Sequence, residues 1–264
     1  MIFEGSILFP SISCLLITLF CFYYFKKKNI LIDDVKYSKH KKLNYSNLKK
    51  IPLCGGIILY ISSLLFFSNE LILLKLSGLG ILIVGIFSDT NKISSPKSRI
   101  LLQLLFLSLF VIFSDLRITD LRINFFDQLL NIKIISIIFT VFCLLILLNG
   151  SNFLDGLNTL VIGYYILVLG IIIFFSNQFN LFLNDNIFYF LIFLIILFLF
   201  NFFGKIYLGD SGSYLISFFV AFFVLDFINN NNYVSPYFIC LLLWYPAFEN
   251  LFSILRRILL NKKI

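Results

Sequence analysis

Long apolar runs separated by short polar stretches occupy most of the chain. The runs are about 15 to 20 residues long, the length of an α-helix that crosses a hydrocarbon core of about 30 Å, and they lack the alternation of membrane β-strands. This pattern predicts an all-α, polytopic transmembrane helical bundle. The nine predicted spans are 6–25, 52–67, 71–87, 100–114, 134–148, 159–176, 187–203, 213–228 and 236–258.

The first apolar run is predicted to be a retained helix rather than a signal peptide, because Lys26, Lys27 and Lys28 follow it without a small-residue cleavage site. Basic residues mark the cytoplasmic side of a membrane protein. If the N-terminus is outside, nearly all basic loop residues fall on the cytoplasmic side. We therefore expect an outside N-terminus and a cytoplasmic C-terminus. The basic residues left outside are Arg117, Arg122 and Lys133.

Composition supports the membrane prediction. Apolar residues make up 60% of the 264 positions and charged residues only 13%, about half the share that is usual in soluble domains. The net charge of +8 suits anionic lipid headgroups and by itself indicates no nucleic acid. The five cysteines form no C-x-x-C pair and are typical of small apolar residues. No internal repeat or linker divides the chain, which predicts a single membrane domain over 1–264.

Four polar motifs precede the even-numbered spans, whose N-termini should all lie at the cytoplasmic face. Helix N-termini expose unpaired N–H groups and carry about half a positive charge, so several of them at one surface favour an anion, phosphate above all. The motifs are "KKIPLCGG" at 49–56, "SDTNKISSPKSR" at 88–99, "NGSNFLDGLN" at 149–158 and "YLGDSGS" at 207–213.

Three of these motifs contain an aspartate at a span boundary: Asp89, Asp155 and Asp210. Helix capping is an alternative explanation for any one of them. Three carboxylates beside a phosphate site would repel one another and the ligand unless a divalent cation lay between them, and Mg²⁺ commonly joins carboxylates to substrate phosphates. The pattern predicts phosphoryl transfer from a nucleotide-type donor at the membrane surface.

Asparagines accompany the middle aspartate. Asn149, Asn152, Asp155 and Asn158 are three residues apart, which would stack them along one face of a helical turn. Ligand contact is favoured, with helix capping as the alternative for the first two asparagines. Because polar groups near a membrane interface are less costly than groups at its centre, the inference of function is weaker here.

The last span carries Arg256 and Arg257 at its cytoplasmic exit. Anchoring to lipid headgroups and a clamp on a diphosphate are both open for this pair. His40, the only histidine, lies in a lysine-rich loop and is interpreted as a solvated surface residue.

In this order, the motifs resemble the polyprenyl-phosphate N-acetylhexosamine-1-phosphate transferase family (glycosyltransferase family 4), which includes phospho-N-acetylmuramoyl-pentapeptide transferase. The similar stretches are "IPLCGG", "SDTNKISSPKSR", "NGSNFLDGLN", "YLGDSGS" and "YPAFENLFSILRR". The resemblance implies Mg²⁺-dependent transfer of a sugar 1-phosphate from a UDP-N-acetylhexosamine to polyprenyl (undecaprenyl) phosphate, with release of UMP. It also implies an active site on the cytoplasmic face of a bacterial inner membrane, in cell-envelope polysaccharide synthesis, and leaves a homodimer open.

The resemblance further implies roles for individual residues. The implied catalytic residues are Asp89, Asp155 and Asp210. The implied magnesium ligands are Asp210 and Asn152. The implied substrate-binding residues are Asn149, Asn152, Asn158, Gly209, Ser211, Arg256 and Arg257.

Two departures from the family pattern keep other hypotheses open. Where the family usually has two adjacent acids, this chain has Ser88 and Asp89, and it stops at Ile264, before the family's histidine-rich loop. The chain is therefore either a truncated form or a divergent member, and a degenerate member would bind nucleotide-sugar or lipid without turnover. A secondary transporter is disfavoured, because the carboxylates cluster at one face and the clear charge inside a span is Lys75.

Overall fold

The computed structural model describes residues 4–33 and 50–260. Within them the regular secondary structure is helical, the helices are joined by loops, and a single bridge pairs Ile32 with Pro52. Each predicted span overlaps one α-helix of the structure. His40 and the lysines at 36–49 lie outside the described residues. The elements are α1 (Glu4–Lys28), α2 (Gly55–Phe66), the short 3₁₀ turn η1 (Asn69–Leu71), α3 (Ile72–Asp89), α4 (Pro96–Ser114), α5 (Asn124–Leu130), α6 (Lys133–Leu154), α7 (Leu160–Phe179), α8 (Asn186–Phe202), α9 (Gly209–Asn230) and α10 (Pro236–Leu259).

Seven of the described helices are long and apolar enough to cross a membrane, judged by length and composition. The helices α2 and α8 are apolar but shorter, at 12 and 17 residues. At a rise of 1.5 Å per residue, α2 spans about 18 Å, less than a hydrocarbon core. The protein is therefore an all-α membrane protein, while the number of nine spans and the orientation of the termini stay predictions.

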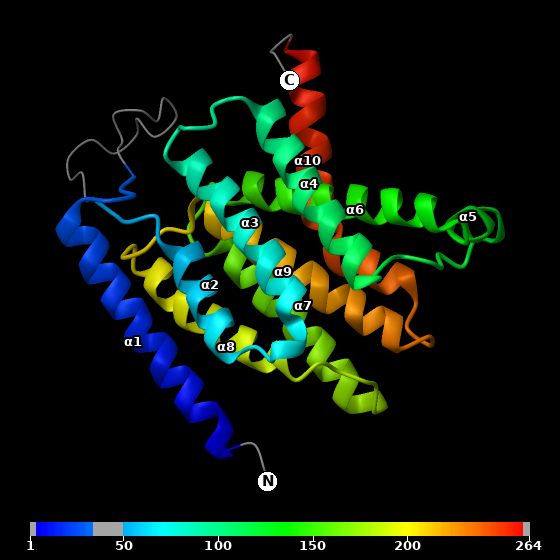
Figure 1. Cartoon of the computed structure of the whole chain (residues 1–264), viewed down its shortest axis with the longest axis horizontal. Coiled ribbons are helices and arrows are strands. Elements are labelled where there is room, and N and C mark those ends of the chain that lie inside the picture. The colour runs from blue at the N-terminus through cyan, green and yellow to red at the C-terminus, as the bar shows by residue number, and fades with distance from the viewer. Residues whose placement is uncertain (1–3, 34–49, 261–264) are drawn as a thin grey trace.

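Helix α9 is the central helix of the bundle (Figure 1). Its apolar window is 89% buried, against 44% or less for the other candidate spans. Helices α2, α3 and α6 pack around it. Aromatic side chains fill this core; for example, the rings of Phe110 and Phe218 meet edge to face with centroids 5.0 Å apart. A helix that is apolar on all sides must be buried in this way, so α9 is a rigid support for the motif at its start.

The N-terminal ends of α2, α4, α7 and α9 lie at one end of the bundle, as the sequence predicted. The backbone N–H of Gly55 donates to the carbonyl of Tyr207 at 3.2 Å, which joins the starts of α2 and α9. The backbone N–H of Thr159 donates to Oδ1 of Asn201 at 2.6 Å, and Asn201 in turn donates to the carbonyl of Ile206 at 2.8 Å. We call this end the site end and the opposite end the far end.

Three helix boundaries lie four or more residues outside the predicted spans. Helix α9 begins at Gly209 rather than 213, α4 begins at Pro96 rather than 100, and α6 continues to Leu154 rather than 148. The predicted spans ended where the apolar runs end, but neighbouring helices satisfy the polar residues, so the helices continue through them. The added turns carry Asp210, Arg99 and Asn152.

Pro246 fixes α10 against α6 and α7. Proline has no N–H, so the carbonyl of Leu242 four residues earlier lacks its helical partner. The hydroxyl of Tyr164 on α7 donates to that carbonyl instead. On α6, a Cβ at Gly150 would lie 2.0 Å from the Pro246 carbonyl oxygen, so only glycine permits this approach. These contacts bring the last turns of α10 beside the end of α6.

Lys75 is buried in α3 with 5% exposure. Its Nζ donates to the carbonyls of Phe67 at 2.9 Å and Leu64 at 3.3 Å, at the end of α2. A cation at a helix C-terminus is favourable, because it complements the helix dipole and the unpaired carbonyls. The charge of Lys75 inside a predicted span therefore has a capping role in the fold.

Candidate active site

Asp89, the last residue of α3, caps the N-terminus of α9. Its Oδ1 accepts the backbone N–H of Asp210 at 2.7 Å, and its Oδ2 accepts that of Ser211 at 3.1 Å. A capping carboxylate usually belongs to the N-cap residue of the same helix. Here Leu208 holds the N-cap position and a neighbouring helix supplies the acceptor. Capping, which the sequence left open for Asp89, is thus its observed contact, although the capped helix is not its own.

Gly209 makes room for this cap. Its φ is +67°, in the left-handed region that favours glycine, and a Cβ there would lie 2.8 Å from both carboxylate oxygens of Asp89. Any other residue would combine an unfavourable backbone conformation with a clash. The sequence predicted that Gly209 contacts substrate; in the structure its described neighbour is Asp89.

Asp210 lies in the first turn of α9 and contacts side chains of two other helices. Its Oδ2 accepts hydrogen bonds from the hydroxyl of Ser88 and, at 3.1 Å, from Nη1 of Arg99. Arg99 also donates to Oγ of Ser88 at 2.9 Å. The Arg99 and Asp210 side chains are 26% and 28% exposed, so solvent and ligands can reach them. The other oxygen, Oδ1, accepts no hydrogen bond from the part of the chain that the structure describes.

Asn152 of α6 faces α9 one turn beyond Asp210. Its Oδ1 accepts the hydroxyl of Ser213 at 3.2 Å, and its Nδ2 donates to the hydroxyl of Tyr214 at 3.1 Å. The Ser213 hydroxyl also lies 3.2 Å from the backbone carbonyl of Asp210. The two predicted metal ligands, Asp210 and Asn152, are therefore joined through Ser213.

Asn149, one turn before Asn152, links α6 to α4. Its Nδ2 donates to the carbonyl of Leu145 at 2.9 Å and to Oε1 of Gln103 at 3.0 Å. The first bond fixes the Asn149 amide, and the second therefore fixes the orientation of Gln103. As a result Nε2 of Gln103 is buried without a hydrogen-bond partner among the described residues. The observed contacts of Asn149 are thus internal ones.

We call this group of side chains the Asp210 cluster. The starts of α4 and α9 and the ends of α3 and α6 supply its members, so it combines hydrogen-bond donors, one guanidinium and one open carboxylate oxygen. Helix N-termini favour an anion, and hard oxygen donors favour a hard cation. The members are Ser88, Asp89, Arg99, Gln103, Asn149, Asn152, Asp210, Ser213 and Tyr214.

The model of glycosyl transferase family 4 matches residues 71–228, more than half of the chain. The chain belongs to glycosyl transferase family 4. The matched segment contains the whole Asp210 cluster and confirms the resemblance found in the motifs. The protein is therefore a sugar-phosphate transferase with apolar helices that suit a membrane-embedded, lipid-using enzyme. No curated protein matches the chain.

Asp155 and Asn158 are placed differently in this family 4 protein from what the spacing predicted. Helix α6 ends at Leu154, so Asp155 is the half-buried C-cap residue and Asn158 is exposed in the following loop. The prediction of one continuous helical face is wrong for Asn158, because the helix has already ended. Asn149 and Asn152 do share α6.

Ser211, a predicted substrate-binding residue, is fully buried. Helix α3 passes so close that a Cβ at Gly85 would lie 2.2 Å from Cα of Ser211. Its Oγ has no hydrogen-bond partner among the described residues. Ser211 therefore contributes its backbone N–H to the Asp89 cap and lies away from the exposed surface of the cluster.

The two arginines of α10 have different surroundings. The Arg257 guanidinium lies over the ring of Phe153, 5.4 Å from its centroid, at the end of α6. Arg256 is exposed. The structure thus brings Arg257 next to the "NGSNFLDGLN" motif, whereas for Arg256 headgroup anchoring and a diphosphate clamp both stay open.

The three predicted catalytic aspartates do not form a metal-binding cluster by themselves. Within 4–33 and 50–260, no three His, Cys, Asp or Glu side chains gather as metal ligands. Asp89 and Asp210 are neighbours through the α9 cap, while Asp155 ends α6. A cation at this end would therefore rely on Asp210, on amide and hydroxyl oxygens and on the substrate.

Sequence reasoning missed Arg99, Gln103, Ser213 and Tyr214 as members of the site. A signal for the first pair was present: "SSP" marks a helix start at Pro96, and from there Arg99 and Gln103 are four residues apart on one face of α4. Ser213 and Tyr214 follow Asp210 by three and four residues, again one helical face.

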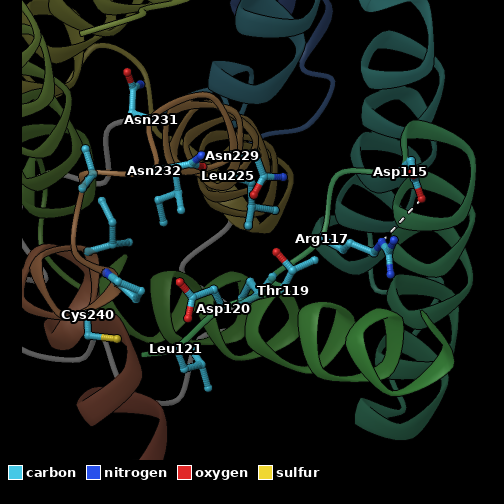
Figure 2. Close-up of a pocket in the computed structure, with 15 residues that line it drawn as sticks. Asp115, Arg117, Thr119, Asp120, Leu121, Leu225, Asn229, Asn231, Asn232 and Cys240 are labelled. Carbon is cyan, nitrogen blue, oxygen red and sulfur yellow. Dashed lines mark ion pairs between the residues drawn. The ribbon is translucent and has the colours of Figure 1, made fainter. Parts of the chain in front are cut away.

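A cavity of about 380 Å³ lies at the far end, between the loop after α4 and the start of α10 (Figure 2). Asp115 and Arg117 of its lining form an ion pair, with Nε of Arg117 3.5 Å from Oδ1 of Asp115. Nζ of Lys133, which is not part of the lining, lies 3.1 Å from the same oxygen. The hydrogen bond and charge of Lys133, with the charge of Arg117, lower the pKa of Asp115. Nearby, Arg122 donates to the backbone carbonyls of 232–234. These contacts show that the polar side chains at the far end hold its loops together. The candidate active site is therefore the Asp210 cluster at the site end.

Proposed function

We propose that the protein transfers N-acetylhexosamine 1-phosphate from a UDP-sugar to polyprenyl phosphate and releases UMP, at the cytoplasmic face of a bacterial inner membrane. Membership of glycosyl transferase family 4 supports the reaction class. The observation that carries the proposal is the open Oδ1 of Asp210, in the first turn of the central helix. Arg99 binds the other oxygen of the same carboxylate, and Asn152 binds Ser213 one turn further along α9.

The described residues fit a magnesium ion in their donor chemistry. Mg²⁺ is usually held by one or two carboxylates together with substrate phosphates, and it keeps several waters. Oδ1 of Asp210 and the amide oxygen of Asn152 are hard oxygen donors of this kind. When bound, the ion would neutralise negative charge on the diphosphate of the donor.

The residues of the chain would mainly position the reactants. The N-terminal turns of α4 and α9 face the site end, where their dipoles favour the diphosphate. Arg99 offers a guanidinium that suits phosphate oxygens. An oxygen of the lipid phosphate would attack the sugar-bearing phosphorus, and the bond from that phosphorus to the UMP oxygen would break. Positioning of this kind accounts for most of the catalysis in phosphoryl transfer.

The test is transfer of radiolabelled sugar from UDP-N-acetylglucosamine to undecaprenyl phosphate by the purified chain with Mg²⁺. Asp210→Asn should lower the rate at least about a hundredfold, because the charged ligand is lost. Asp120→Asn, which changes a carboxylate at the far end, is the matched control and should keep the wild-type rate. Equal rates for wild type and Asp210→Asn would contradict the proposal.

A second candidate function is binding of the nucleotide-sugar without turnover. It is favoured by the engagement of Oδ2 of Asp210 with Ser88 and Arg99, together with the engagement of both Asp89 oxygens with α9. It predicts saturable binding of UDP-sugar that depends on Arg99, with no UMP released over several hours. Release of UMP in step with lipid labelling would rule it out.

A further inference from the structure

A single nitrogen of Arg99 bridges two side chains of the site. Nη1 donates to Oγ of Ser88 at 2.9 Å and to Oδ2 of Asp210 at 3.1 Å. The other guanidinium nitrogens, Nη2 and Nε, donate no hydrogen bond to the described residues. Arg99 thus uses only one of its nitrogens as a donor, and the N–H groups of the other two can bind a ligand from the exposed side.

The guanidinium lies where a cation would compete with it. Asp89 directs both oxygens to backbone N–H groups of α9, so Asp210 is the carboxylate of the cluster with an oxygen left open. A divalent cation on Asp210 would lie within a few ångströms of the positive charge of Arg99, and at this partly exposed position the two charges repel strongly. Metal binding to Asp210 therefore opposes the Arg99–Asp210 ion pair.

A diphosphate resolves this competition. Arginine binds phosphate through two parallel N–H bonds, a stronger arrangement than the single Nη1 contact with Asp210. Ser88 holds Arg99 only through a neutral hydroxyl and therefore offers it no second charge. When a diphosphate draws the guanidinium away, Oδ2 of Asp210 keeps only the neutral hydroxyl of Ser88, and the positive charge that opposes a metal at Asp210 is removed.

We infer that Arg99 keeps Asp210 closed to metal until the diphosphate of the donor takes over its guanidinium, so that metal and nucleotide-sugar bind cooperatively. The inference rests on the proposed function, which supplies the diphosphate and the cation. Arg99 acts on the metal through Asp210 and is in this sense a positioning residue. Its effect is a coupling between two ligands, and such couplings are reciprocal.

The experiment measures Mn²⁺ binding by electron paramagnetic resonance to the full chain in nanodiscs, with and without UDP. Because UDP itself binds Mn²⁺, Asp210→Asn with UDP provides the baseline. In wild type, UDP should tighten Mn²⁺ binding about tenfold beyond that baseline. Arg99→Gln should bind Mn²⁺ about tenfold more tightly than wild type without UDP, and UDP should add little. Arg99→Lys keeps the charge and should restore weak Mn²⁺ binding in the absence of UDP.

Equal Mn²⁺ affinities of wild type and Arg99→Gln without UDP would overturn the inference, as would Mn²⁺ binding that does not depend on Asp210. Monodisperse elution of each variant, together with UDP binding by Arg99→Lys, controls for misfolding. The transfer assay separates this inference from the proposed function. If wild type transfers sugar phosphate but wild type and Arg99→Gln have equal Mn²⁺ affinities, only the inference is overturned. If Mn²⁺ and UDP bind cooperatively but wild type transfers no sugar phosphate, the proposed function is overturned.

Discussion

The carboxylate of Asp89 lies 2.7 Å from the backbone nitrogen of Asp210, although 121 positions separate the two residues in the chain. This bond ties the end of α3 to the start of the central helix. It fixes Asp210 in the first turn of α9, where its side chain accepts hydrogen bonds from Ser88 and Arg99. The site therefore depends on a tertiary helix cap as much as on its polar side chains.

Removal of this cap should destabilise the protein. Asp89→Ala leaves two N–H groups of α9 without their acceptor, which should lower the free energy of unfolding by about 1 to 2 kcal/mol. Unfolding in mixed micelles followed by circular dichroism measures the change. Asp185→Ala is the control, because Asp185 occupies the N-cap position of α8 without a side-chain cap. A drop of equal size in both variants would show that Asp89 is no special cap.

Gly209→Ala should destabilise the protein more than Gly204→Ala. Both glycines have positive φ, +67° and +60°, but a Cβ at 209 meets Asp89 whereas a Cβ at 204 meets nothing within 4 Å. Both variants should lose about 1 kcal/mol for the backbone conformation, and only Gly209→Ala should lose the cap in addition. The same unfolding measurement compares them. If Gly204→Ala is the less stable variant, the close approach of Gly209 to Asp89 contributes nothing to the free energy of unfolding.

Ser88→Asp should strengthen metal binding. The new carboxylate would lie beside Asp210 and would also attract Arg99, so a divalent cation between the two acids relieves their repulsion. We expect Mn²⁺ to bind about tenfold more tightly than to wild type, as followed by electron paramagnetic resonance. Ser88→Asn has a similar size without the charge and should leave the Mn²⁺ affinity near that of wild type. Weaker Mn²⁺ binding by Ser88→Asp would argue against a cation at Asp210.

Tyr164→Phe tests the contact at Pro246. Without the hydroxyl, the carbonyl of Leu242 has no partner, which should cost about 1 kcal/mol. In a Pro246→Ala background the helix regains its own N–H, so the same substitution should cost almost nothing. A double-mutant cycle on the free energy of unfolding gives this coupling. Additive effects of the two substitutions would contradict the account of how α10 is held.

Much of the fold could be predicted from the sequence, because the thickness of a membrane sets the length of each apolar run. The gathering of the polar motifs at one end also followed from the alternation of the spans. The helix ends could not be placed by hydropathy alone, since α9 continues through Asp210 and α6 through Asn152 with partners from other helices.

The contacts within the site were less predictable. The cap of α9 by Asp89 joins residues that are far apart in sequence, and no local pattern reports such a contact. Arg99 looked like one more basic residue of a cytoplasmic loop until α4 was found to begin at Pro96. Ser88, identified in the sequence as a missing acid, lies at the junction of Arg99 and Asp210, where its hydroxyl bonds both.

The most direct test of the central claim uses UDP-N-acetylglucosamine labelled with tritium in the sugar and with ³²P in the phosphate attached to it. The account predicts that wild type places both labels in the polyprenyl lipid in equal amounts and that Asp210→Asn places neither there. Tritium without ³²P in the lipid would mean that the sugar alone is transferred, and this result would contradict the account.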